Sequence, residues 1–525
     1  MVELLNNIKL TKQGYIIPKS VLTKKQLEKI MDDLNMKPLV DERFKKVEED
    51  GFNIYLETTS NKIILPRYYG IEKFGIPLDN NIRFKELDNF DKIDIEFKGE
   101  LRDYQTDIIN SILNEYSYDI TQPNNTLQKY GGGIISIPPG KGKTVLAINL
   151  ITKLKIRTLV IVHKTFLLNQ WKERINQYTD ATIGIIQQDN IDINNKDIVI
   201  AMLQSITQKT YDKELFSAFP LVIYDECHHL GAKIFSKSLI KVQAPYYLGL
   251  SATPNRKDKL ETIFKYFLGD VKFKDTIKTN NDVIVKLYEY NNNDTTNFKT
   301  LYNKFTKTYN AAKMITNLCK INNRNDLIIK IIIDILKDEP NRKILILSGR
   351  CNSAKNENSV NHIKILSDKL SEHPHLVDKW GYYIGGMKQI KLEISSSKQI
   401  IIGTYEMAQE GLDISSLDTL ILSTPLKGDI IQTCGRILRG NNIHTPMIID
   451  IIDMIEPFNN QAKFRYGHYV LSKYNCNYFS IDNENNEIKI NPLSKLSIEP
   501  IFVRKKKIEI KPEIKSEINL DLFSD

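Results

Sequence analysis

Two series of short apolar runs constrain the fold of this chain more than any other feature. Each run is rich in Ile, Val and Leu and ends at polar or Gly/Pro residues, and most are followed by a stretch of helical length. In chain order they are "GGIISI", "TLVIVH", "DIVIAM", "LVIYDE" and "YYLGLS", then "KILILSG", "QIIIGT", "TLILST" and "MIIDII". Strands that helices bury on both faces have this composition. The pattern therefore predicts α/β units built on doubly wound parallel sheets.

The length of 525 residues exceeds what one hydrophobic core supports and suggests about three or four domains. The expected parts are a small N-terminal α/β domain at 1–95, a first lobe at 96–285, a linker at 286–320, a second lobe at 321–470, and an extension with a flexible tail at 471–525. Within the first part, Thr23 is a plausible helix cap before "KKQLEKIMDDL".

Composition excludes several classes of protein. The five cysteines are scattered and form no C-x-x-C pair, which favours a reducing compartment over a disulfide framework or a structural zinc. The most apolar stretch, 327–336, is short, contains Lys330 and Asp334, and is typical of a buried helix. We therefore expect a soluble intracellular protein without a signal peptide or membrane contact. The net charge of +9 is compatible with a polyanionic partner.

The segment "IISIPPGKGKTVLAINL" places a Pro/Gly loop between a buried strand and a helix. Glycines let the backbone approach a phosphate chain, and the helix N-terminus adds its amides and its positive dipole end. The lysine would pair with the β- and γ-phosphates, and the threonine hydroxyl would bind Mg²⁺. The strict phosphate-loop pattern has Gly at the position of Ile137. The predicted ATP-binding residues here are Pro139, Gly140, Lys141, Gly142, Lys143 and Thr144.

The run "LVIYDECHH" ends a buried strand in two carboxylates, a thiol and two imidazoles. Zinc would accept these ligand types, but alternate strand residues point to opposite faces, and no second Cys/His pair is present. A phosphate-loop enzyme needs strand-end carboxylates for Mg²⁺ and for the attacking water. We therefore assign Asp225 to the metal and Glu226 to the water, and interpret His228 and His229 as hydrogen-bonding links.

The order of the glycine-rich loop, "DECH", "SAT" at 251–253 and "QTCGRILR" at 432–439 resembles the superfamily 2 helicases and translocases over about residues 100–455. This resemblance implies two RecA-like lobes with ATP and Mg²⁺ as cofactors. It also implies that Gln432, Arg436 and Arg439 are catalytic, with the arginines reaching the γ-phosphate. A helix over this motif would place these residues on one face.

Further segments follow the same resemblance. "LRDYQTDII" resembles the upstream glutamine motif, "IVHKTFLLNQW" a loop that holds a nucleic-acid backbone, and "GTYEMAQEGLDI" a segment that contacts nucleic acid and ATP. The resemblance assigns Gln105, Arg102, Gly411 and Asp413 to the nucleotide, and Lys164, Thr165, Gln204 and Thr404 to nucleic acid.

Within the superfamily, "LGLSATPNRKDKLETIFKYFLG" and the stretch from "GYYIGG" to "EGLDI" look closest to the XPB/UvsW-like group, and nearest to helicases of large cytoplasmic DNA viruses, including the poxvirus transcript-release helicase. This implies a DNA-dependent ATPase with 3′-to-5′ translocation or strand-separating activity in viral transcription, repair or recombination. It would be a monomer or weak oligomer in the host cytoplasm or the virion, with the transcription or repair machinery as a partner.

Three alternatives remain open at this point. The same motifs suit an RNA-dependent ATPase that remodels RNA or a ribonucleoprotein. A phosphotransferase acting on a small molecule would need neither a second lobe with arginines nor stimulation by polynucleotide. A non-catalytic scaffold would have no evident reason to keep the full set of predicted ATP-site residues.

Overall fold

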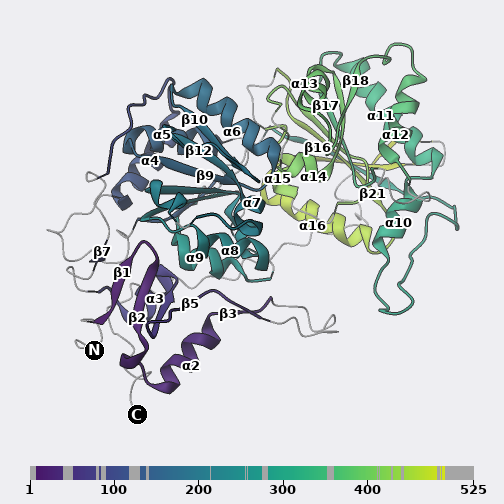
Figure 1. Ribbon diagram of the computed structural model, residues 1–525. Helices are drawn as coiled ribbons and strands as arrows, with labels where there is room; N and C mark the ends of the chain where they lie inside the picture. Colours follow the sequence, from purple (N-terminus) through teal and green to yellow (C-terminus); the bar gives the residue numbers. More distant parts are fainter. Residues whose placement is uncertain are drawn as a thin grey trace. The chain divides into compact units, whose positions relative to one another are not determined.

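The computed structural model describes residues 7–38, 51–77, 82–83, 90–116, 131–137, 141–212, 214–252, 254, 256, 258–274, 282–351, 360–410, 412, 414–426, 430–438, 443–481, 485 and 487–490. The chain forms two compact units, Met1–Lys278 and Thr279–Asp525, both drawn in Figure 1. The predicted flexible tail lies outside the described residues from position 491 onward.

The first unit contains an eight-stranded sheet in the order β11-β10-β12-β9-β13-β14-β8-β15. All neighbours pair in parallel except β10 and β11. The strands are β8 (Ile134–Ser136), β9 (Thr158–Val162), β10 (Ile183–Gln187), β11 (Asn190–Ile191), β12 (Ile198–Met202), β13 (Leu221–Asp225), β14 (Tyr246–Ser251) and β15 (Val271–Lys274). The five apolar runs predicted as strands in this part of the chain are β8, β9, β12, β13 and β14.

Helices bury both faces of this sheet (Figure 1). Successive residues of β9 alternate between the two cores, with Leu159 and Ile161 on one face and Val160 and Val162 on the other. The helices on the second face are α4 (Asp103–Tyr116), α5 (Lys143–Leu154) and α6 (Thr165–Tyr178). Those on the first face are α7 (Leu203–Gln208), α8 (Lys233–Lys241) and α9 (Glu261–Leu268). This is the predicted doubly wound arrangement.

A small N-terminal sheet in the order β5-β6-β2-β1-β7 also belongs to the first unit. Its strands are β1 (Lys9–Thr11), β2 (Gly14–Pro18), β5 (Leu56–Glu57), β6 (Lys62–Leu65) and β7 (Ile82–Arg83), with β3 (Asn35–Met36) paired to β4 (Phe52–Asn53), and with helices α2 (Lys24–Asp33) and α3 (Arg67–Phe74). Thr23 forms a capping box with Gln26 at the start of α2, which confirms the predicted cap.

A buried arginine joins this small sheet to the larger one. Arg67, at the first position of α3, is 3% exposed. Its guanidinium donates to the carbonyls of Pro245 at 2.7 Å and Ala244 at 2.9 Å, just before β14. It also lies over the Tyr247 ring, 5.5 Å from the centroid. Because a buried cation is costly without acceptors, these contacts fix α3 against the amino end of β14.

The second unit contains another eight-stranded sheet, in the order β18-β19-β17-β20-β21-β16-β22-β23. All neighbours pair in parallel except β22 and β23. The strands are β16 (Ile284–Tyr290), β17 (Ile344–Ser348), β18 (Trp380–Tyr383), β19 (Ile400–Thr404), β20 (Thr419–Leu422), β21 (Met447–Asp453), β22 (Asn475–Ile481) and β23 (Glu487–Ile490). Two parallel α/β sheets and a small N-terminal sheet confirm the predicted fold class. The domain bounds drawn from the sequence stay predictions.

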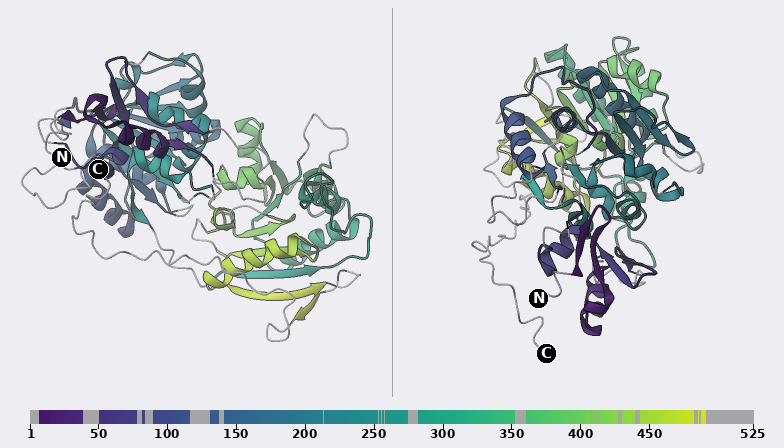
Figure 2. Two further views of the ribbon diagram at one scale, coloured as in Figure 1. Left: turned by 90° about the horizontal axis from the view of Figure 1, so that it is seen from below. Right: turned by 60° about the vertical axis from the view of Figure 1, so that its left-hand side comes forward.

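Helices cover both faces of the second sheet too. One core packs α10 (Ala311–Leu318), α11 (Asn322–Asp338) and α12 (His362–Ser371), and the other packs α14 (Tyr405–Glu410), α15 (Ile430–Cys434) and α16 (Phe458–Leu471), while α13 (Gln389–Ser397) lies beside β18. Figure 2 shows α16 lying along its face of the sheet. The predicted buried helix at 327–336 is part of α11. Among the described residues, no helix is long and apolar enough to cross a bilayer.

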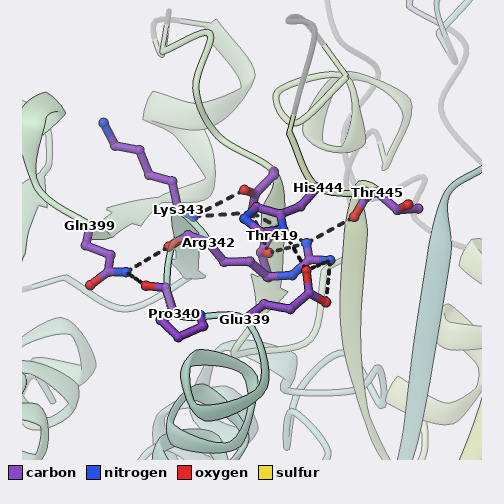
Figure 3. A network of polar contacts seen from close by, with 9 residues as sticks. Glu339, Pro340, Arg342, Lys343, Gln399, Thr419, His444 and Thr445 are labelled. Carbon is purple, nitrogen blue, oxygen red and sulfur yellow. Dashed lines mark hydrogen bonds and ion pairs between the residues drawn. The ribbon is translucent and has the colours of Figure 1, made fainter.

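A polar network fastens the amino ends of the second sheet (Figure 3). At its centre Arg342, 1% exposed, donates to Thr419 Oγ1 at 3.2 Å and to the Thr445 carbonyl at 3.0 Å. Glu339 accepts from Arg342 at 3.0 Å and pairs with His444 Nδ1 at 2.7 Å. These contacts tie the segments that enter β17, β20 and β21.

A buried chain of hydrogen bonds holds the opposite, carboxyl end of β17. His362 Nδ1 lies 2.9 Å from Ser348 Oγ, and its Nε2 lies 3.0 Å from Asn325 Oδ1. Ser348 Oγ also accepts from the Arg350 amide at 3.1 Å. Since an amide oxygen only accepts, Nε2 carries the proton and Nδ1 accepts from the serine. Burial, and then the charge of Arg324, lower the pKa of His362 to about 3.

We expect the stability of the second unit to fall as the pH drops below about 6.5, because the unfolded histidine is protonated near that value while the folded one stays neutral. The pKa of His362 is lower in the folded state than in the unfolded state. Its contribution to the free energy of unfolding is therefore complete above the unfolded pKa and is lost as the pH falls. Each pH unit removes about 1.4 kcal/mol for one such group. Urea unfolding between pH 7 and pH 5 measures the slope.

His362→Gln keeps a donor for Asn325 but cannot take up a proton. It should be less stable than the wild type at pH 7 and less sensitive to acid. His375→Gln, at an exposed position, should keep the wild-type slope. Both variants retain His468, whose pKa burial lowers to about 4 and which adds its own slope. A wild-type slope in His362→Gln would contradict the assignment.

Candidate active site

The strand β8, the loop after it and helix α5 build the predicted phosphate site. Gly142 is the N-cap of α5, with φ of 79° in the left-handed region, and Lys143 and Thr144 form the first turn. A Cβ atom at Gly142 would lie 2.4 Å from Gln105 Nε2. The backbone conformation therefore favours glycine, and a Cβ atom would also push the Gln105 amide away from its present place. The twelve residues of α5 place a positive dipole end and the amides of the first helical turn at Gly142.

The start of α4 supports the loop from the side. Gln105, 4% exposed, donates from Nε2 to the Lys141 carbonyl at 3.1 Å and accepts from the Arg102 amide at 3.0 Å. Tyr104 Oη donates to the same Lys141 carbonyl at 3.0 Å. The Lys141 ammonium in turn lies 5.3 Å from the centroid of the Tyr104 ring. The structure thus brings three predicted nucleotide-site residues together: Arg102, Gln105 and Lys141.

The two carboxylates at the end of β13 lie beside this loop. Lys143 Nζ donates to Glu226 Oε1 at 2.9 Å, and the two side chains are 12% and 16% exposed. Glu226 has φ of 49°, and its amide donates to Asp225 Oδ1 at 3.0 Å. The left-handed turn at Glu226 redirects its side chain toward α5. Residues far apart in the sequence, Lys143, Asp225 and Glu226, are therefore brought together as predicted.

The surroundings push the pKa values of the two carboxyls in opposite directions. Burial acts to raise the pKa of Glu226, but the Lys143 ammonium and His228 outweigh it and hold that pKa well below its ordinary value. Burial and the neighbouring charge of Glu226 raise the pKa of Asp225, against the opposing effects of Lys143 and Trp171. Divergent pKa values in one buried pair are typical of catalytic carboxylates.

The side chain of Trp171, in α6, was not among the predicted site residues. Its Nε1 donates to Asp225 Oδ2 at 2.8 Å, and it is 1% exposed. Asp225 is therefore fixed at both oxygens, by an indole and by a backbone amide. The sequence signal was weak, because an apolar tryptophan inside a helix usually belongs to the core.

The imidazoles after the carboxylates link neighbouring loops. His228 Nδ1 lies 3.0 Å from Ser251 Oγ, at the end of β14, and 3.4 Å from Glu226 Oε2. Arg256, also missed by the sequence analysis, donates to the His228 carbonyl at 2.6 Å. The predicted linking role is confirmed for His228. Among the described residues, no three His, Cys, Asp or Glu side chains are grouped so as to hold a metal ion.

A magnesium ion suits the oxygens that this site offers. Hard divalent cations prefer carboxylate and hydroxyl oxygens, and Asp225 and Thr144 supply them. Glu226 Oε2 is buried and lies 3.4 Å from His228 Nδ1, without a closer hydrogen-bond donor among the described residues. Such an acceptor can take a proton from bound water. The donor set therefore fits Mg²⁺ together with its water.

The predicted nucleic-acid residues of the first unit lie at strand ends of the same sheet. Lys164 is the N-cap of α6 directly after β9, and Thr165 is exposed in its first turn. Gln204, after β12, donates to the His163 carbonyl and so joins the ends of β9 and β12. Because carboxyl ends of parallel strands share one edge, these residues lie on the edge that carries Lys143 and Glu226.

In the second unit, Thr404 ends β19 and its hydroxyl accepts from the Met407 amide at 3.3 Å, which caps α14. Arg436 is 6% exposed and donates to the Leu412 carbonyl at 2.8 Å. Gln432 is buried as well, at 8% exposed. The prediction of one helix through residue 439 is wrong, because α15 ends at Cys434. Thr433, Cys434 and Gly435 are poor helix formers, and turns continue the chain instead.

Several predicted site residues lie outside the described part of the chain. They are Pro139, Gly140, Gly411, Asp413 and Arg439, together with Thr253 of the "SAT" motif.

The chain is similar in sequence to several known proteins. Residues 98–256 match the family model described as Type III restriction enzyme, res subunit. This range contains the phosphate loop and the carboxylate pair. The chain is 34% identical over 526 residues to a protein of Acanthamoeba polyphaga mimivirus that carries the name ATP-dependent RNA helicase, covering 99% of this chain and 95% of that protein.

Two further relatives carry related names. A protein of Invertebrate iridescent virus 6 named as a helicase is 30% identical over 400 residues, covering 72% of this chain and 83% of that protein. The "DNA 3′-5′ translocase XPB2" of Sulfurisphaera tokodaii is 31% identical over 220 residues, which is 40% of this chain and 44% of that protein.

We expect Gly142→Ala to weaken nucleotide binding and to lower stability. Alanine in the left-handed region is strained by about 1–2 kcal/mol, and its Cβ would also meet Gln105 Nε2. The double variant Gly142→Ala with Gln105→Ala removes the collision and should recover that part of the loss in a double-mutant cycle. Thermal unfolding and binding of a fluorescent ATP analogue measure both effects.

Gly386→Ala is the matched control for this experiment. Gly386 also has a positive φ, of 82°, but a Cβ atom there would meet nothing within 4 Å. The Gly386→Ala variant should lose stability through backbone strain alone and should bind the nucleotide as the wild type does. Equal nucleotide affinity in Gly142→Ala and the wild type would remove Gly142 from the site.

Proposed function

We propose that this chain, which belongs to the superfamily 2 helicases and is related to those of large DNA viruses, is a motor that moves along DNA and separates its strands. As a member of this family it is a nucleic-acid-dependent ATPase. Viral transcription, repair or recombination would be its setting. The observation that carries the proposal is the buried pair of Lys143 with Glu226, adjacent to Asp225.

In the proposed mechanism, the β- and γ-phosphates of ATP compete with Glu226 for the Lys143 ammonium. The amides at the start of α5 and the backbone at Gly142 receive the phosphate chain. When Lys143 turns to the phosphates, Glu226 loses its cation, its pKa rises, and the carboxylate becomes available to orient and deprotonate water. Nucleotide binding would thus release the base only when substrate is present.

Magnesium would be held by Thr144 and Asp225, and it would neutralise charge on the phosphate oxygens. Trp171 and the Glu226 amide keep Asp225 oriented for this task. Arg436 and Arg439 would stabilise the charge that develops on the transferring phosphoryl group. Gln432, from the same motif, would help to position these two arginines. Gln105 and Arg102 would shape the nucleotide side of the loop, and Gly411 and Asp413 would complete it.

The polynucleotide would bind along the carboxyl edges of the sheets, through Lys164, Thr165, Gln204 and Thr404. Contacts of this kind go mainly to phosphates and carry little sequence preference. DNA is the proposed substrate because the motif segments resemble the XPB/UvsW-like group, in line with the similarity to the archaeal XPB2 protein. The RNA alternative is supported by the names of several relatives, since the mimivirus protein and proteins of African swine fever virus both carry the name ATP-dependent RNA helicase.

We expect Lys143→Ala to lose nucleotide affinity by at least about tenfold, since a charge-assisted bond to phosphate disappears. Glu226→Gln should bind ATP and still accept the Lys143 hydrogen bond, yet turn over at a rate lower by about 10²–10⁴-fold, the contribution of a general base. Equilibrium binding and steady-state hydrolysis separate the two defects. Lys153→Ala, an exposed position near the end of α5, serves as the control. Normal hydrolysis by Glu226→Gln would remove its assigned role.

We expect duplex or single-stranded DNA to stimulate ATP hydrolysis more than RNA of the same sequence. The measurement compares steady-state rates without polynucleotide and with each kind, using Glu226→Gln to exclude a contaminating ATPase. Stimulation chiefly by RNA would replace the DNA motor with the RNA-remodelling alternative. Equal rates under all conditions would reject the motor.

A further inference from the structure

A short hairpin in the second unit presents aromatic rings and lysines to solvent. It spans residues 299–310, "KTLYNKFTKTYN", between β16 and α10. Phe305 at its tip is 89% exposed, and Tyr302 and Tyr309 are 57% and 39% exposed. The segment contains three exposed lysines and no acidic residue. None of the proposed catalytic steps uses it.

The hairpin is ordered by its own backbone. Tyr302 and Tyr309 form an antiparallel bridge, and their rings stack with centroids 5.1 Å apart and planes 28° apart. The Asn303 amide donates to the Thr308 carbonyl at 2.7 Å, and the Lys307 amide donates to the Asn303 carbonyl at 3.0 Å. The Asn303 side chain accepts from the Phe305 amide at 3.0 Å. Phe305 is thus positioned by a tight turn rather than by packing of its ring.

The base of the hairpin is fastened to the sheet. Tyr309 Oη donates to Glu456 Oε2 at 2.6 Å, and Thr300 Oγ1 donates to the Glu456 carbonyl at 3.0 Å. Glu456 follows the end of β21. The Asn310 side chain accepts from the Lys313 amide and caps α10. The hairpin therefore projects from the carboxyl ends of β16 and β21.

This location places the hairpin on the same edge as Thr404. Four steps between neighbouring strands separate β19 from β16 in the sheet order. At about 4.8 Å a step the edge extends for about 19 Å. A single strand that passes the end of β19 can reach the hairpin within a few nucleotides. The chain thus offers a continuous path along one edge of one unit.

The residue types point to unpaired nucleic acid as the ligand. A single exposed apolar side chain is common on protein surfaces, and lysines alone are usually solvated. The hairpin combines aromatic rings with lysines and has no carboxylate in its segment. This combination suits the binding of single-stranded nucleic acid. Bases stack on aromatic faces, and phosphates are neutralised by lysines. A protein partner would instead need a contiguous apolar patch.

We propose that this hairpin binds the first unpaired nucleotides of the substrate, with a base stacked on Phe305 and phosphates on Lys304 and Lys307. At a duplex junction, stacking on Phe305 would replace the stacking that the separated base loses. The hairpin would then convert translocation into strand separation. This inference rests on the proposed motor function and names the element that opens the duplex.

The direct test uses tryptophan as a probe at position 305. Phe305→Trp should keep the stacking surface, and single-stranded DNA should quench its fluorescence without ATP. Ile443→Trp is the matched reference, since Ile443 is 94% exposed and precedes β21 at the opposite edge. The wild-type signal of the two native tryptophans is subtracted from both. Equal quenching at the two positions, or none at 305, would overturn the proposal.

The functional test compares Phe305→Ala with Ile443→Ala. Phe305→Ala should bind single-stranded DNA at least about fivefold more weakly, the lower end for loss of one base–aromatic stack. Its unwinding of a duplex with an overhang should fall by more than that. Its maximal ATPase rate with saturating DNA should stay within about twofold, because the nucleotide site is intact. Ile443→Ala should match the wild type throughout.

The outcomes separate this inference from the proposed function. If the wild type shows no stimulation by any polynucleotide, the motor fails, whereas the quenching at position 305 still reports on the hairpin. If the wild type is stimulated and unwinds DNA, and Phe305→Ala does the same with unchanged affinity, only the hairpin proposal fails. A docking role toward protein would give that second result.

Discussion

The ion pair between Lys143 and Glu226 is the interaction on which the rest of the site depends. It joins segments 83 positions apart and places the first turn of α5 against the end of β13. Because both side chains are mostly buried, neither charge is stable there without a partner. In the proposed mechanism, nucleotide phosphates would offer the lysine a second partner, so ATP must compete with the same ion pair that holds α5 against β13. The Trp171 bond to Asp225 fixes the position of the second carboxylate beside this ion pair.

The second unit also contains a buried cation, Arg324, and the histidine near it is neutral. Arg324 is fully buried and forms two bonds with Asp453, at 2.7 and 2.8 Å, while its third donor reaches the Ser423 carbonyl at 2.7 Å. Burial, and then the positive charge of Arg324, disfavour a protonated imidazole and lower the pKa of His362, so its side chain stays neutral. The neutral imidazole donates to Asn325 and accepts from Ser348, whose hydroxyl oxygen in turn accepts from the Arg350 amide. Neutral hydrogen-bonding groups therefore hold the carboxyl end of β17 in place.

The sequence predicted what repeats along the chain and what local chemistry dictates. Apolar runs predicted nine of the strands, Thr23 predicted the cap of α2, and the glycine-rich loop with strand-end carboxylates predicted that Lys143, Asp225 and Glu226 lie together. It did not reveal the contact of Trp171 with Asp225, because that contact arises when α6 packs on the sheet and leaves no spacing in the chain. The end of α15 at Cys434 was missed for a different reason. The matched motif fixes residue types at helical spacing, whereas the weak helix formers inside it decide where the backbone turns.

The two edges of each sheet differ in how their cations are used. At the amino edges, Arg67 and Arg342 are buried, and the acceptors that neutralise them belong to the fold itself: backbone carbonyls for Arg67, and a carbonyl, a threonine and Glu339 for Arg342. At the carboxyl edges, Lys143 has a carboxylate that a phosphate would replace in the proposed mechanism, and the hairpin lysines have no carboxylate within their segment. Arg324 is also neutralised by the fold, although it lies at the carboxyl ends of β20 and β21 with Ser423 and Asp453. Lys143 and the hairpin lysines, whose charge a ligand can take up, lie where parallel strands end. This is the edge at which open α/β sheets bind ligands, and it is also the edge from which Phe305 projects.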